Sequence, residues 1–116
     1  MTATDPRGAR RVLVTGANGY IGRLTVEALA ADPRALERIV ALDVRETPEA
    51  ARRPGVVYLQ GDVRGEAVVN ACREHAVDTV VHLASIVTPG PRDDRATSFA
   101  VDVEGTQRVL GACVAA

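Results

Sequence analysis

The sequence predicts an α/β fold in which helices cover both faces of a parallel sheet. Short apolar runs alternate along the chain with segments of helical periodicity, as expected for repeated strand–helix units. The apolar runs are rich in Val, Leu and Ile, which is typical of strands buried on both faces. A glycine-rich turn joins the first apolar run to the first helical segment.

The first half of the chain predicts two strands and one helix. Residues 11–15 form the first apolar run and the first strand. A helix is expected over 20–31, and Pro33 stops it. The second strand covers residues 38–43, and a connecting loop with one helical turn follows over 46–55.

The second half predicts two further strands and two helices. The strands cover residues 56–60 and 79–83, with a helix over 66–75 between them. A loop over 84–94 contains the sequence Pro-Gly-Pro and leads into a long helix over 95–114. Apolar residues recur along this last helix at the helical period.

Right-handed crossovers and the turn after the first strand predict the sheet order 3-2-1-4. This is a Rossmann-like parallel sheet, and it is incomplete, because a full doubly wound sheet continues beyond the fourth strand. We expect residues 1–10 to be a polar leader and residues 11–116 to form one domain. The fourth strand should leave an open edge to which a partner or a second copy of the chain can pair.

Composition excludes several function classes. The chain has 116 residues, of which 47% are hydrophobic, and a net charge of −1, so it predicts one packed domain without a nucleic-acid-binding surface. Neither a signal peptide nor an apolar stretch of the roughly 18 residues that span a bilayer is present, so we expect a cytoplasmic protein without membrane contact. Cys72 and Cys113 are predicted to be reduced thiols, and no spacing indicates a metal site.

Residues 15–22, TGANGYIG, form a phosphate-binding type of turn between a strand and a helix. Gly16 allows the tight turn, Gly19 lets the backbone approach a pyrophosphate, and Gly22 lets the helix pack closely on the sheet. The helix N-terminus adds free N–H groups and the positive end of the helix dipole. The alternative is a turn that only reverses the chain and binds nothing.

An acidic residue ends the second strand. Asp43 stands 21 positions after Gly22, where a carboxylate can accept hydrogen bonds from an adenosine ribose. The same carboxylate would repel a 2′-phosphate, so NAD is expected in preference to NADP. Arg45 argues the other way, because a basic side chain there can pair with that phosphate.

Five short patterns together resemble the extended short-chain dehydrogenase/reductases, and within them the NAD-dependent epimerase/dehydratase family. They occur in the family's order at residues 15–22, at Asp43, and at residues 61–63, 82–85 and 101–106. The resemblance covers about residues 11–113 and corresponds to the N-terminal, cofactor-binding part of the family. It implies that residues 11–116 are the N-terminal portion of an NAD-binding Rossmann domain.

The resemblance implies a role for each matching residue. The three glycines would line the pyrophosphate, and Tyr20 and Ile21 would offer it backbone N–H groups. Asp43 would bind the ribose, and Asp62 and Val63 would flank the adenine. The expected cofactor site is Gly16, Asn18, Gly19, Tyr20, Ile21, Gly22, Asp43, Asp62, Val63, Leu83, Ala84 and Ser85, with the last three beside the ribose and phosphate.

Residues of the family's catalytic centre are missing from the sequence. The family uses a Tyr-x-x-x-Lys pair, but this chain has no lysine, and Tyr20 and Tyr58 lie in the glycine turn and a strand. Asp102 stands where the family usually has Asn, and an ionised carboxylate accepts hydrogen bonds without donating them. We therefore assign no catalytic residue here and expect the chain alone to be inactive, whether it is a fragment or a natural short form.

The expected function is NAD binding for an epimerase, dehydratase or dehydrogenase that acts on a nucleotide sugar or similar substrate. Two alternatives remain: a non-catalytic dinucleotide-binding module, and an interaction protein. Individual residues also have simpler interpretations. His82 is expected to be a packed, hydrogen-bonded histidine, and Asp62 can close an Asx turn.

Overall fold

The computed structural model describes residues 8–85 and 94–115, and its centre is a parallel sheet of four strands. The strands are ordered β3-β2-β1-β4, so the predicted order is confirmed. Most of the expected leader and of the loop over 84–94 lies outside the described residues. The strands are β1 (Arg11–Thr15), β2 (Arg38–Asp43), β3 (Val56–Gln60) and β4 (Thr79–His82).

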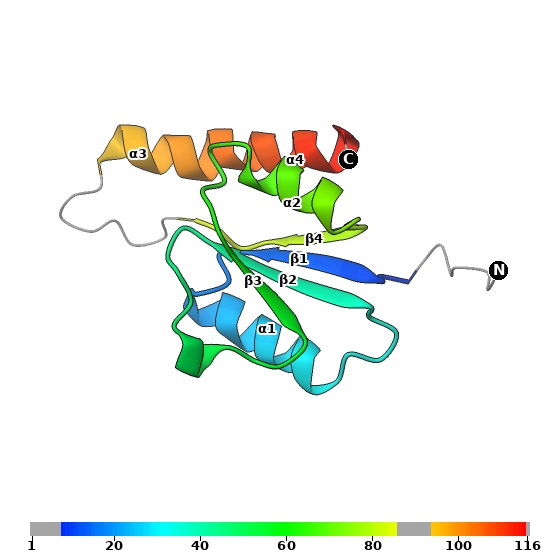
Figure 1. Cartoon of the computed structure of the whole chain (residues 1–116). Helices are drawn as coiled ribbons and strands as arrows, with labels where there is room; N and C mark the ends of the chain where they lie inside the picture. Colours follow the sequence, from blue (N-terminus) through cyan, green and yellow to red (C-terminus); the bar gives the residue numbers. More distant parts are fainter. Residues whose placement is uncertain (1–7, 86–93, 116) are drawn as a thin grey trace.

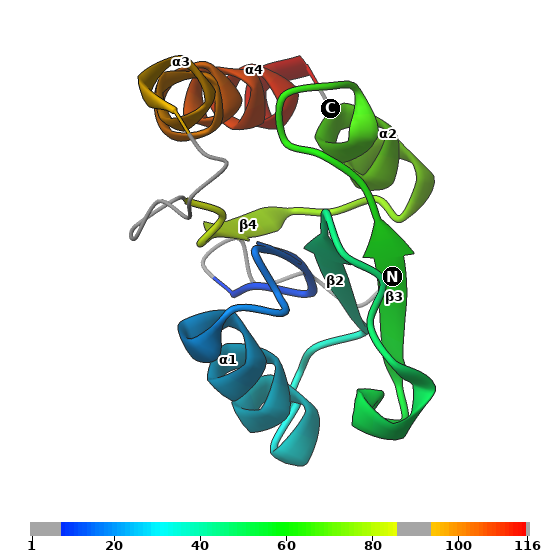
Figure 2. The ribbon, with the colours of Figure 1, turned by 90° about the vertical axis from the view of Figure 1, so that its left-hand side faces the viewer.

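Helices cover both faces of the sheet, as predicted (Figures 1 and 2). Helix α1 (Tyr20–Ala31) lies on one face. On the other face lie α2 (Ala67–Glu74) and a long rod in three parts. The rod consists of α3 (Arg95–Phe99), the π-helical segment η2 (Ala100–Gly105) and α4 (Thr106–Ala115).

The π-helical segment corrects one expectation. A single long helix is expected over 95–114, but its middle third, η2, has the wider hydrogen-bond spacing of a π-helix. π-helical turns are rare and occur often at functional sites. Here the segment carries Val101, which lines the pocket described below, and Asp102, which bonds to a residue of that pocket.

Alternating residues of the central strands build two cores, one on each face. Leu13, Val40 and Leu42 are almost fully buried on the side of α2 and α4. Val14 and Ala41, their neighbours along the strands, are buried on the side of α1. Because successive side chains of a strand point to opposite faces, two-sided burial accounts for the continuous apolar runs in the sequence.

The connection from β2 to β3 covers residues 44–55. It contains only a single 3-10 turn, η1 (Glu49–Ala51), where many crossovers carry a helix. Among the described residues, α1 is therefore the one long helix on its face of the sheet. No helix in the described part of the chain has the length and apolarity needed to cross a membrane.

Candidate dinucleotide site

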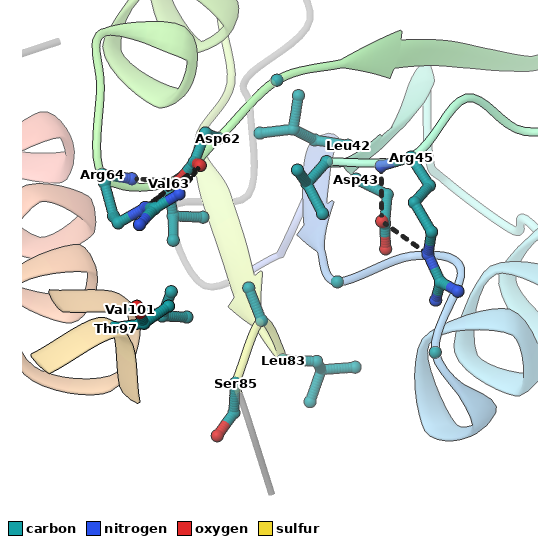
Figure 3. Close-up of a pocket in the computed structure, with 15 residues that line it drawn as sticks. Leu42, Asp43, Arg45, Asp62, Val63, Arg64, Leu83, Ser85, Thr97 and Val101 are labelled. Carbon is teal, nitrogen blue, oxygen red and sulfur yellow. Dashed lines mark hydrogen bonds and ion pairs between the residues drawn. The ribbon is translucent and has the colours of Figure 1, made fainter. Parts of the chain in front are cut away.

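The carboxyl ends of all four strands meet at one edge of the sheet, where a pocket of about 300 Å³ opens (Figure 3). Ligands of open α/β sheets bind in this position, next to the point where strand order reverses. The reversal lies here between β1 and β4. Eight of the twelve residues expected in the cofactor site line the pocket: Gly16, Gly19, Asp43, Asp62, Val63, Leu83, Ala84 and Ser85.

Two glycines of the turn are required by the fold itself. Gly16 has a φ of +68°, and a Cβ there would lie 2.7 Å from the backbone nitrogen of Ala84. A Cβ on Gly22 would collide with the carbonyl oxygen of Gly16. A side chain at either position would therefore push the turn away from β4 or from the start of α1.

Gly19 is different from the other two. Its φ of −71° suits any residue, and the nearest atom to a Cβ built there is the Gly16 carbonyl oxygen at an ordinary 3.4 Å. Gly19 also lines the pocket and is the N-cap of α1. The fold therefore tolerates a side chain at this position, but the pocket would lose the space that the side chain occupies.

The N-terminus of α1 follows directly. Tyr20 and Ile21 are 72% and 56% exposed, and their side chains, like Gly22, do not line the pocket. Their contribution to the site is the backbone, because the first N–H groups of a helix have no partner within the helix. These groups and the helix dipole favour an anion at Gly19.

Asn18 links the glycine turn to the segment after β2 by hydrogen bonds. Its backbone N–H donates to Oδ2 of Asp43 at 2.9 Å, and its side-chain amide donates to the Arg45 carbonyl at 3.0 Å. The side-chain oxygen of Asn18 accepts a hydrogen bond from Thr47 at 2.8 Å. Asn18 does not line the pocket, so it acts here by fixing the glycine turn against the segment after β2.

The carboxylate of Asp43 is held in place at the pocket wall. Its side chain is 8% exposed, and Oδ1 accepts the backbone N–H of Arg45 at 3.0 Å. The guanidinium Nε of Arg45 lies 3.9 Å from the same oxygen and is largely exposed. Each carboxylate oxygen thus accepts one backbone hydrogen bond and retains capacity for a ligand hydroxyl.

Asp62 is engaged by Arg64 on the opposite side of the pocket (Figure 3). The Arg64 guanidinium donates to both carboxylate oxygens, with the shortest contact 2.7 Å from Nη2 to Oδ2. The Arg64 backbone N–H donates to Oδ1, which closes the Asx turn. These hydrogen bonds from Arg64 hold the pKa of Asp62 below its ordinary range.

His82 is part of a hydrogen-bonded chain beneath the pocket. Thr15 Oγ1 accepts the N–H groups of Leu83 and Ala84, so its hydrogen is directed to His82 Nδ1 at 2.6 Å. The proton on Nε2 is then donated to Thr106 at 3.1 Å. Burial lowers the pKa of His82, consistent with a neutral ring held in place by this chain.

The rod contacts the pocket through Thr97 of α3 and Val101 of η2. Ser85 donates a hydrogen bond from its hydroxyl to Oδ1 of Asp102 at 2.9 Å. This contact ties the segment after β4 to the π-helical turn. Asp102 thus has a partner that donates to it, which suits a carboxylate at a position where the family usually has an amide.

Seven residues of the pocket wall are not among the twelve expected in the cofactor site. Thr97 and Val101 are four positions apart on the rod, a spacing that places both on one helical face. That spacing was visible in the sequence, but nothing in it showed that this face turns to the pocket. The other five lie within two positions of Asp43 or Asp62 in the sequence: Leu42, Val44, Arg45, Gly61 and Arg64.

Fold and site together define a Rossmann-type α/β domain with a glycine turn at the switch point of its sheet. Residues 13–116 match the 3-beta hydroxysteroid dehydrogenase/isomerase family, and the chain belongs to that family. The expected resemblance to the extended short-chain dehydrogenase/reductases is thereby confirmed.

Curated and solved relatives agree with this assignment. An L-arabinose 1-dehydrogenase (NAD(P)(+)) of Haloferax volcanii is 38% identical over 91% of this chain. UDP-glucose 4-epimerase of Thermus thermophilus, solved with NAD, is 36% identical over 89% of this chain, with a TM-score of 0.70. A short-chain dehydrogenase/reductase superfamily protein of Agrobacterium tumefaciens with bound NAD is 34% identical over 91%, with a TM-score of 0.71.

These relatives are longer than the chain described here. The matched region spans 37% of the Haloferax volcanii dehydrogenase, 33% of the Thermus thermophilus epimerase and 29% of the Agrobacterium tumefaciens protein. The common region is therefore the part that carries the glycine turn and the four strands.

Proposed function

We propose that this chain binds NAD in the pocket at the carboxyl edge of the sheet and serves as the cofactor-binding portion of an oxidoreductase. The carrying observation is that Gly19, at the N-terminus of α1, and the buried carboxylate of Asp43 line one pocket. An anion-binding helix end and a fixed hydroxyl acceptor are the two groups that an adenosine diphosphate moiety needs.

Each expected residue has a place in this proposal. The pyrophosphate lies against Gly16 and Gly19, where the N–H groups of Tyr20 and Ile21 favour its charge. Asp43 accepts hydrogen bonds from the adenosine ribose. Gly22 supports the helix, and Asn18 fixes the turn to Asp43.

Different residues line the two ends of the pocket in this proposal. Asp62 and Val63 flank the adenine, but the Asp62 carboxylate already accepts from Arg64, so Arg64 also contacts this end of the ligand in the proposal. Leu83, Ala84 and Ser85 lie beside the cofactor's second ribose and phosphate. Bound NAD supplies a hydride acceptor, and the residues of this chain bind and orient it.

The wider activity follows from the same assignment. We place the chain in an epimerase, dehydratase or dehydrogenase that acts on a sugar or nucleotide sugar, in the cytoplasm, where thiols such as Cys72 and Cys113 stay reduced. The Thermus thermophilus epimerase and the Haloferax volcanii arabinose dehydrogenase support this substrate class. The terminal strand β4 offers an edge for a second copy or a partner.

Calorimetric titration of the chain with NAD tests the proposal. We expect saturable binding of one NAD per chain, and competition by adenosine diphosphate ribose, which keeps the groups that the pocket recognises. Nicotinamide mononucleotide, which lacks the adenosine, serves as the matched control and should bind far more weakly. Absence of NAD binding to protein that circular dichroism shows to be folded would contradict the proposal.

A further inference from the structure

A second pocket lies on the other side of the glycine turn. Its volume is about 310 Å³, and it opens between α1 and the segment that carries η1, with Tyr58 of β3 also in its wall. The crossover from β2 to β3 contributes to this wall a single 3-10 turn in place of a long helix. Ala17 and Asn18 of the glycine turn line it, whereas Gly16 and Gly19 line the first pocket.

Positive charge dominates the wall of this second pocket. Three arginines, Arg23, Arg52 and Arg53, line it, and Glu27 is the one acidic residue among its lining residues. Glu27 pairs with Arg53 at 3.3 Å. The lining therefore carries three positive charges against one negative charge.

Two of the arginines are already fixed in position. Arg52 donates from Nε to the Thr47 carbonyl at 3.1 Å, and its guanidinium lies 5.7 Å from the centre of the Tyr58 ring. An ion pair with Glu46 at 3.8 Å adds to this arrangement. The backbone N–H of Arg53 donates to the Tyr58 hydroxyl at 2.8 Å, so the hydrogen of that hydroxyl remains available to a ligand.

The third arginine has no such partner. Within residues 8–85 and 94–115, the guanidinium of Arg23 makes no hydrogen bond or ion pair, although it stands at the wall of a pocket. Arg23 is exposed, so an anion placed between it and the other two arginines would replace water as the partner of its guanidinium. Guanidinium groups bind phosphate oxygens with two parallel hydrogen bonds, which makes phosphate the matching chemistry.

We propose that this second pocket binds the phosphate group of a small phosphorylated metabolite, separately from the dinucleotide pocket. Arg23 and Arg53 contact the phosphate, Arg52 stacked on Tyr58 forms the third wall, and Glu27 weakens binding by competing for Arg53. Because Asn18 belongs to this pocket and also donates to Asp43, the two ligands would share the glycine turn as a common wall.

Titration with inorganic phosphate and with pyrophosphate at low, constant ionic strength tests the proposal. Phosphorus NMR line widths and calorimetry report binding to the whole chain in the absence of NAD. Arg23→Gln and Arg53→Gln should each weaken binding about tenfold, the effect of losing one charge-assisted contact. Glu27→Gln should strengthen binding, because it removes the opposing charge and frees Arg53.

Arg73→Gln is the matched control, since Arg73 is an exposed arginine of α2, across the sheet from the pocket. It should leave phosphate affinity unchanged, and circular dichroism should show all four variants to be folded. Equal weakening by Arg73→Gln, or no change in Arg23→Gln and Arg53→Gln, would overturn the proposal.

A last titration distinguishes phosphate binding in the second pocket from phosphate binding in the dinucleotide pocket. With NAD at saturation, phosphate should still bind with an affinity that depends on Arg23. Displacement of phosphate by NAD would overturn the proposal, because it would assign the anion to the glycine turn of the dinucleotide pocket. If NAD itself does not bind, the arginine variants still decide the question, so this test and that of the proposed function fail separately.

Discussion

At the scale of single residues, Gly19 is a position where a side chain should affect ligand binding more than it affects the fold. The backbone there accepts any residue, and a Cβ meets no close contact. We predict that Gly19→Val keeps the folded structure and loses NAD binding, because its branches occupy the space of the pyrophosphate. Titration with NAD beside circular dichroism of the same sample checks this, and a folded variant with parental affinity would move the phosphates elsewhere.

Gly22→Ala should behave in the opposite way. Its Cβ would collide with the Gly16 carbonyl oxygen at the start of α1, so the first effect is on stability. Overpacking of this kind costs about 1–3 kcal/mol of unfolding free energy. Urea unfolding of this variant and of Gly19→Ala gives the comparison, and equal stability of the two would contradict the assigned roles.

The choice between cofactors also belongs to a single residue. Asp43 is buried at the pocket wall, and its carboxylate would repel a 2′-phosphate and lose a ribose hydrogen bond, at a cost of about 1–3 kcal/mol for NADP. Calorimetric titration of both cofactors at one salt concentration checks the preference for NAD. Equal or tighter binding of NADP would show that Arg45 outweighs Asp43.

Backbone features of the site were more predictable than side-chain contacts. The spacing of Gly16 and Gly22 predicts a turn because only glycine fits the geometry found there. The engagement of Asp62 by Arg64 depends on the conformation of an Arg64 side chain that is 44% exposed, and the spacing of the two residues does not determine that conformation. Asn18 stays a predicted residue of the cofactor site, and its hydrogen bonds to Asp43 and Thr47 also fix the glycine turn.

At the scale of elements, the chain of hydrogen bonds through His82 joins β1, β4 and the rod. Burial lowers the pKa of His82 below its ordinary value of 6.5, so the unfolded chain takes up a proton at higher pH than the folded chain. Stability should therefore be complete above about pH 6.5 and fall as the pH drops below it.

Urea unfolding of the parent and of His82→Gln between pH 8 and pH 5 measures this effect. His75 is present in both proteins, so the difference between the two pH profiles belongs to His82. We expect the parent to lose more stability than the variant as the pH falls. Parallel profiles would mean that His82 titrates alike in the folded and unfolded chains.

The pattern of apolar residues predicts the strands of this fold but not the π-helical segment. β1 and β2 were predictable because two-sided burial leaves a continuous apolar run. The π-helical segment η2 was not, since a change in backbone hydrogen-bond pattern within a helix leaves the apolar period nearly unchanged. The segment carries Val101, which lines the pocket, and Asp102, which accepts a hydrogen bond from Ser85.

At the scale of the whole molecule, these 116 residues contain the proposed cofactor site but no Tyr-x-x-x-Lys pair of the family's type. Tyr20 is 72% exposed outside the pocket, and the Tyr58 hydroxyl accepts the Arg53 N–H. We predict no epimerase, dehydratase or dehydrogenase turnover by this chain alone, because hydride transfer needs a paired acid or base. Assays with NAD and nucleotide sugars check this, and robust turnover would refute it.

The open edge of β4 predicts association in solution. Among residues 8–85 and 94–115, β4 is hydrogen-bonded to β1 alone, so its other edge offers backbone groups to a further strand. We expect the isolated chain to form dimers or larger species as its concentration rises. Light scattering over a range of concentrations measures this, and a monomer throughout would show that the edge is protected.

The central claim is that NAD binds in the pocket at the carboxyl edge of the sheet, and NMR mapping of the binding site tests it most directly. Backbone amide shifts recorded during a titration should change most at Gly19, Tyr20, Asp43 and Asp62, and little in α2 or at Arg34 on the opposite end of the sheet. Saturable shifts concentrated at the carboxyl edge are the predicted result. Shifts confined to other surfaces, or none at all in the folded chain, would contradict the assignment of this pocket to NAD.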